Sequence, residues 1–140
     1  SNRYRDSTIQ ESVDENQRSE TAITRATKAA AMVNGTVKMT LDTNGTLHLS
    51  GGSFGTSVGS SAGSWLVKTL NANGYQATQV LKIVIEGQIT ATTIHDYSYL
   101  FANLPNVTNV DGLANLNLTG VTDISWMFTI SSVGCQQLGC

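Results

Sequence analysis

The sequence predicts an α+β fold in which a β-hairpin and a short helix cap the start of a solenoid. The first observation is a pair of alternating strands around a turn at residues 36–50, and the second is a helical apolar spacing near residue 65. The third is a series of large apolar residues at every third position, which fits neither an amphipathic helix nor a half-buried strand. Short extended segments joined by tight turns would produce such a spacing. The series comprises Leu104, Val107, Val110, Leu113 and Leu116, followed by Leu118, Val121, Ile124 and Met127.

Residues 1–32 are predicted to form a polar tail or a helical linker. They carry most of the charged residues of the chain and few apolar ones, which are Ile9, Val13 and Ile23. The Ala-rich stretch at its end permits a helix, but one that would be only marginally stable alone.

Residues 33–79 are predicted to form the cap. Residues 36–41 and 46–50 alternate in polarity on either side of Asp42-Thr43-Asn44-Gly45, which predicts a β-hairpin. The Gly/Ser-rich stretch from Gly51 to Gly63 is expected to be a flexible loop.

A short helix is predicted to follow this loop and to cover one end of the core. Its apolar residues, Trp65, Leu66 and Leu70, lie at helical spacing, and Ser60 or Ser61 is the expected N-cap, with Gly74 at the end. The first unit of a solenoid exposes an apolar face, so a capping element is required there.

Residues 80–140 are predicted to form solenoid rungs, and the array is incomplete. The rungs are expected at Val80–Ile85, at Val107–Asp111 and just after Val133. The spacing Leu113-x-x-Leu116-x-Leu118 matches the opening of the leucine-rich-repeat signature.

Two runs in this region carry a family resemblance. Residues 100–108, Leu-Phe-Ala-Asn-Leu-Pro-Asn-Val-Thr, and 121–128, Val-Thr-Asp-Ile-Ser-Trp-Met-Phe, resemble the BspA-like leucine-rich-repeat proteins of bacterial cell surfaces. The aromatic closures Phe101 and Phe128 are 128 − 101 = 27 positions apart, within the leucine-rich-repeat range. The resemblance implies an N-terminal cap plus the first repeat of such a protein. It departs from the family pattern at Leu118 and Gly120 and ends after Val133.

Composition excludes several function classes. The chain of 140 residues has eight basic and ten acidic residues, a net charge of −2, so neither nucleic-acid binding nor binding to an anionic membrane surface is expected. It has no apolar run long enough to insert into a membrane. The sequence after residue 33 contains few charged residues and many Thr and Asn residues, a composition that favours a secreted or surface protein.

No metal or cofactor is expected. His48 and His95 are the only histidines, and neither has the set of three or four ligands that a zinc site requires. Cys135 and Cys140 lack Cys-x-x-Cys spacing, and both a disulfide and two free thiols are compatible with their positions. No catalytic constellation is found, so the chain is predicted not to be an enzyme.

The enzymatic alternative is a glycan-processing enzyme that uses paired carboxylates, or a redox enzyme that uses Cys135 and Cys140. Asp96, Asp111 and Asp123 are the candidates, with Asp111 and Asp123 as the pair. Each is expected to lie at a turn, where an Asp side chain commonly caps backbone amides, so the capping role is the favoured interpretation.

Exposed aromatic side chains are the predicted partner-binding residues. Trp126, Tyr97 and Tyr99 are the candidates, because aromatic residues dominate binding hot spots. Trp126 is the strongest, since it stands where the family pattern has a small residue.

The function expected from these observations is a non-enzymatic surface or secreted module for adhesion or ligand binding. The resemblance implies an extracellular or bacterial cell-surface location and, as partner, a protein or glycan of a host or a neighbouring cell. A purely structural stalk or assembly module is the other alternative. At the open C-terminal end we expect either self-association or a tail, residues 134–140, folded back as a lid.

Overall fold

The computed structural model describes residues 32–129. The chain forms two units, Ser1–Ala31 and Met32–Cys140, and the account below concerns the described residues of the second unit. The predicted tail lies outside the described residues except for Met32, which is fully buried. The predicted rung after Val133 also lies outside them.

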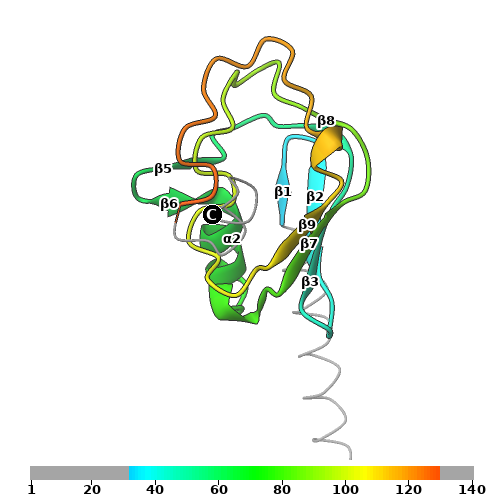
Figure 1. Cartoon of the computed structure of the whole chain (residues 1–140), viewed down its shortest axis with the longest axis vertical. Helices are drawn as coiled ribbons and strands as arrows, with labels where there is room; N and C mark the ends of the chain where they lie inside the picture. Colours follow the sequence, from blue (N-terminus) through cyan, green and yellow to red (C-terminus); the bar gives the residue numbers. More distant parts are fainter. Residues whose placement is uncertain (1–31, 130–140) are drawn as a thin grey trace, which may run out of the picture. The chain divides into compact units, whose positions relative to one another are not determined.

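The predicted hairpin is confirmed and belongs to a larger sheet. Strands β2 (Val37–Leu41) and β3 (Thr46–Leu49) pair antiparallel, with Thr40 opposite His48. The complete sheet has five strands in the order β1-β2-β3-β7-β9, on the right of Figure 1. Its other members are β1 (Val33–Asn34), β7 (Lys82–Ile85) and β9 (Asn109–Asp111). The sheet is mixed, because β7 pairs parallel with both β3 and β9.

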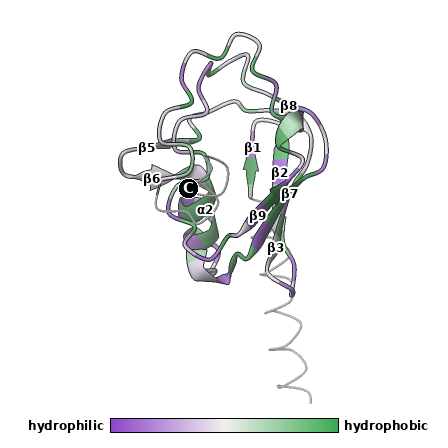
Figure 2. Ribbon diagram, in the orientation of Figure 1, coloured by the Kyte–Doolittle hydropathy of each residue, from purple (hydrophilic) through white to green (hydrophobic). Residues whose placement is uncertain are grey.

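Alternation along the strands gives this sheet a buried face and an exposed face. Leu47, Ile83 and Val110 lie opposite one another across the three parallel strands and are buried. Their neighbours Lys82 and Asp111 alternate with them and belong to the other face. Figure 2 shows polar and apolar residues along these strands.

The stretch from Gly51 to Gly63 is not the flexible loop that its composition suggested. It contains β4 (Gly52–Ser53) and β5 (Gly59–Ser60), and β5 pairs with β6 (Gly63–Ser64). The segment is pinned by Asn34, whose side chain accepts hydrogen bonds from the Gly55 and Thr56 amides at 3.0 and 2.9 Å. Gly and Ser suit this close backbone approach as well as they suit a loop.

The predicted helix is confirmed as α2 (Trp65–Ala72), which buries Leu66 and Leu70. The residue before it, Ser64, is the N-cap, because its hydroxyl accepts a hydrogen bond from the Leu66 amide at 3.0 Å. The predicted caps, Ser60 and Ser61, do not hold this position. A 3-10 turn, η1 (Ala77–Gln79), follows the helix and leads into β7.

Beyond β7 the chain makes two parallel passes, which lie side by side at the top of Figure 1. The first pass (residues 89–103) begins with β8 (Ile89–Thr90), which pairs with β4. The second pass (residues 116–129) follows β9 and the 3-10 turn η2 (Leu113–Asn115). Parallel bridges join Ile89 to Leu116 and Asp96 to Asp123, with offsets of 116 − 89 = 27 and 123 − 96 = 27.

Amides of the first pass donate regularly to carbonyls of the second. The Tyr97, Tyr99, Phe101 and Asn103 amides donate to the Asp123, Ser125, Met127 and Thr129 carbonyls at 2.9 to 3.2 Å. Phe101 and Phe128 stack at 5.4 Å between ring centroids, which adds an apolar contact between the passes.

The predicted leucine-rich-repeat-like solenoid was wrong. The described residues form a mixed α+β structure with one α-helix and several separate sheets, none of them closed or solenoid-like. In the every-third series, Leu104, Val107, Val110 and Leu116 are buried and Leu113 is half-buried, but Leu118 and Ile124 are 56% and 54% exposed. Apolar residues at every third position therefore arise here from a succession of turns, and this pattern does not require the continuous core of a solenoid.

Candidate interaction surface

Trp126 is the most exposed of the large apolar side chains in the described part of the chain. Its relative exposure is 64%, and the sequence predicted that this aromatic residue would be exposed. Its backbone φ of +59° lies in the left-handed region, which a bulky side chain rarely adopts. Residues held in such sparsely populated backbone conformations cluster at functional sites, although His95, Tyr99 and Asn103 share this positive φ.

Tyr99 occupies the corresponding position in the first pass, at 126 − 99 = 27 residues before Trp126, and has the same conformation, with φ of +62°. It is only half-buried. The Tyr99 amide donates to the Ser125 carbonyl at 3.2 Å, so the backbones of Tyr99 and Trp126 lie on neighbouring passes.

The structure places Tyr97 in the core, which corrects its prediction as a partner-binding residue. Its hydroxyl lies 3.1 Å from the Ile89 carbonyl and 2.8 Å from the Asn117 carbonyl, between the two passes. Its ring meets Phe54 edge to face at 6.2 Å. Burial raises the pKa of the Tyr97 hydroxyl. A fully buried ring offers no surface to a partner.

Two further exposed residues, Leu118 and Ile124, were expected in the core and not at a binding surface. They follow Ala91 and Tyr97 by 27 positions each, and these two counterparts in the first pass are fully buried. The second pass covers the first, whereas nothing in the described residues covers Leu118 and Ile124. We call Leu118, Ile124 and Trp126 the second-pass surface.

Asp96 and Asp123 cap turns, as the sequence predicted. The Asp96 carboxylate accepts a hydrogen bond from the Ser98 amide at 2.6 Å, and Asp123 accepts one from the Ser125 amide at 2.8 Å. Hydrogen bonds from the Ser125 side chain and backbone lower the pKa of Asp123. The parallel bridge between the two Asp residues puts these turns side by side.

Asp111 lies on strand β9 and not at a turn. Its carboxylate pairs with the Lys82 ammonium group at 2.9 Å and accepts a hydrogen bond from the Asn109 amide group at 2.8 Å. Bonding to Lys82, and then to Asn109, lowers the pKa of Asp111. A glycosidase needs one carboxyl group with a raised pKa as its acid, and the pKa values of Asp111 and Asp123 are both shifted the other way.

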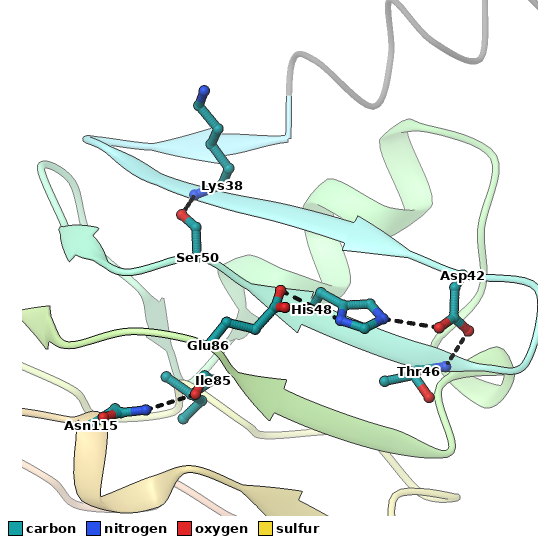
Figure 3. Close-up of polar contacts among 8 residues, drawn as sticks. All are labelled: Lys38, Asp42, Thr46, His48, Ser50, Ile85, Glu86 and Asn115. Carbon is teal, nitrogen blue, oxygen red and sulfur yellow. Dashed lines mark hydrogen bonds and ion pairs between the residues drawn. The ribbon is translucent and has the colours of Figure 1, made fainter.

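His48 lies on the exposed face of the sheet between two carboxylates (Figure 3). Its Nε2 atom is 2.9 Å from Asp42 Oδ2 and its Nδ1 atom is 3.4 Å from Glu86 Oε1. A catalytic His needs one ring nitrogen for the nucleophile, and here both face carboxylates. This cluster links the hairpin turn to the end of β7.

Within residues 32–129 no group of three or more His, Cys, Asp or Glu side chains is arranged to hold a metal ion. Cys135 and Cys140 lie outside these residues. No helix in the described part is both long and apolar enough to cross a membrane.

Comparisons with known proteins found no matching family model, no matching curated protein and no matching solved structure. The resemblance to BspA-like leucine-rich-repeat proteins therefore stays a prediction from the quoted motifs. The second-pass surface is the candidate site that the geometry supports.

Proposed function

We propose that the chain is a non-enzymatic interaction module that binds a partner through the second-pass surface. The observation that carries the proposal is Trp126, a large aromatic side chain that is 64% exposed on a strained turn. Trp is the residue type most often found at binding hot spots, and an exposed apolar group rimmed by polar residues is typical of an interaction site.

The composition and the motif resemblance favour a secreted or bacterial cell-surface setting. In that setting the module would serve in adhesion, with a protein or glycan of a host or neighbouring cell as its partner. The polar surroundings of the site fit a reversible contact: Thr119, Thr122, Asp123 and Ser125 are all exposed.

A direct binding experiment tests this proposal. Fluorescent beads coated with the chain are applied to immobilised extracellular-matrix proteins and to a glycan array, and the Trp126→Ala variant is compared with the unchanged chain. We expect the substitution to lower binding by at least about ten-fold, since a hot-spot Trp contributes 2 kcal/mol or more.

Leu81→Ala is the matched control, because Leu81 is also a large exposed apolar residue but lies against the turn at Gly45. It should leave binding unchanged. If the Trp126→Ala beads bind as well as the unchanged ones, the second-pass surface is not the binding site.

A further inference from the structure

Charge is divided unevenly along the described part of the chain. Its three lysines, Lys38, Lys68 and Lys82, all occur before residue 83, and residues 83–129 contain no Lys or Arg. The same range contains four carboxylates, which are Glu86, Asp96, Asp111 and Asp123.

Two of these four carboxylates already face a basic side chain. Asp111 pairs with Lys82 at 2.9 Å and Glu86 faces His48 at 3.4 Å. Asp96 and Asp123 make no ion pair within residues 32–129. There the Asp96 carboxylate accepts from the Ser98 amide, and the Asp123 carboxylate accepts from Ser125. These two negative charges lie on neighbouring passes, and Trp126 follows Asp123 by three residues in the same turn.

Two backbone amides beside them have no acceptor among the described residues. The Ile124 and Trp126 amides donate no hydrogen bond to any residue in the range 32–129, whereas their first-pass counterparts, Tyr97 and Tyr99, donate to the second pass. Among the described residues, the second pass thus offers amide donors without an acceptor, exposed apolar side chains and the Asp123 carboxylate, with Asp96 on the neighbouring pass.

We propose that the surface formed by Trp126, Ile124, Asp123 and Asp96 binds a polypeptide segment that carries lysine or arginine side chains. This inference rests on the proposed function and names the class of partner. The indole ring of Trp126 would receive the cation and its aliphatic stem, since Trp is the best aromatic partner for a cation. The two carboxylates supply complementary charge, and the Ile124 and Trp126 amides, which have no acceptor within residues 32–129, can pair with carbonyls of an extended peptide.

Charge disfavours one class of the other partner that the proposed function allows, the anionic glycans. Anionic glycans would meet two carboxylates within residues 83–129, a range that contains no Lys or Arg, although the exposed His95 adjoins Asp96. Like charges placed opposite each other at an interface oppose binding. The hydrogen bonds from Ser125 that lower the pKa of Asp123 keep its carboxylate ionised in mildly acidic surroundings too.

The experiment uses the whole chain with the Trp65→Phe substitution, so that Trp126 is the single fluorescent tryptophan. The probes are synthetic peptides of equal length in which Gly alternates with Lys, Arg, Ser or Glu. We expect the Lys and Arg peptides to shift the Trp126 emission and bind, and the Ser and Glu peptides to bind at least about five-fold more weakly. Added salt should weaken the binding of the basic peptides.

Three substitutions test which carboxylates contribute to binding of the basic peptides. Asp123→Asn and Asp96→Asn keep the oxygen that caps each turn but remove the charge, and each should weaken binding of the Lys peptide by about two- to five-fold. Asp111→Asn removes one negative charge elsewhere and should change binding less than either. Thermal unfolding confirms that the variants remain folded.

The outcomes separate this inference from the proposed function. If Lys and Ser peptides bind equally and the Asn variants bind normally, the basic partner is wrong. The proposed function still stands in that case, provided that Trp126→Ala loses binding to the immobilised proteins or glycans. A dimer that sediments without peptide and dissociates in Trp126→Ala would also overturn the inference, because a second copy of the chain would then occupy the surface.

Discussion

Asp42 organises the hairpin turn with a single carboxylate. Its Oδ1 atom accepts the Asn44 and Thr46 amides at 2.8 and 3.0 Å, and its Oδ2 atom contacts His48 at 2.9 Å. The contact with His48, followed by the bond from Thr46, lowers the pKa of Asp42. The charged form is therefore stabilised by the fold.

This pKa shift predicts a pH-dependent stability. Because the pKa of Asp42 is lower in the folded chain than in the unfolded chain, its contribution is complete above the unfolded pKa and is lost as the pH falls through the folded pKa. Asp42→Asn keeps the turn acceptor and removes the charge. Its melting temperature should lie below that of the unchanged chain at neutral pH, and the two should converge in acid. A constant difference at every pH would contradict the charge explanation.

Gly35 is predicted to be the least replaceable glycine. Its φ is +60°, and an added Cβ would lie 2.1 Å from the Ser53 carbonyl oxygen, a backbone atom that cannot turn aside. Gly35→Ala should destabilise the chain by about 3 kcal/mol or more, from left-handed strain plus displacement of the backbone.

Gly74→Ala is the matched substitution for Gly35→Ala. Gly74 has a φ of +85° but nothing within 4 Å of the added Cβ, so strain alone should cost about 1 kcal/mol. Chemical denaturation gives both values. Equal losses would mean that the close approach to Ser53 relaxes without cost.

At the scale of elements, Ser64 joins helix α2 to the first pass. Its hydroxyl accepts the Leu66 amide and donates to the buried Leu100 carbonyl. Ser64→Ala should lower the free energy of unfolding by about 1 to 3 kcal/mol, because the helix loses its cap and a buried carbonyl loses its donor. Ser60→Ala, at an exposed residue, should change it by less than about 0.5 kcal/mol in the same titration. Similar losses would show that the cap is not specific to Ser64.

The elements that the sequence predicted well are those with local signals. The Asn44-Gly45 turn sets the hairpin, because Gly45 adopts a φ of +82° and its amide donates to the Asp42 carbonyl at 3.2 Å. The two passes have no such signal. Their left-handed residues, such as Tyr99 and Trp126, are bulky, and their conformation depends on pairing with a distant segment.

The same distinction limits what could be predicted of the candidate site. Trp126 was correctly expected to be exposed, because it departs from the motif pattern. Tyr97 was not recognised as buried, because its burial is produced by the second pass and by Phe54, far from it in the sequence. Nor did the sequence reveal that Leu118 and Ile124 would stay uncovered, since apolar residues are usually assigned to a core.

At the scale of the whole molecule, stability should be concentrated in the parallel strands. Ile83 is fully buried between Leu47 and Val110, so Ile83→Ala should cost about 2 to 5 kcal/mol. Leu118→Ala, which removes an exposed group, should cost less than about 0.5 kcal/mol. Thermal unfolding followed by circular dichroism compares the two. A large loss in Leu118→Ala would mean that the second-pass surface is covered in solution.

The ladder between the passes has a consequence for amide hydrogen exchange. The four first-pass amides that donate to the second pass, Tyr97, Tyr99, Phe101 and Asn103, alternate with neighbours that make other bonds. If the second pass separates from the first, these four lose protection together, while the amides of β3 and β7 remain protected. Every second amide from residue 97 to residue 103 would then share one opening free energy, below that of global unfolding. A partner bound to the second-pass surface would slow that exchange without touching any of the four amides.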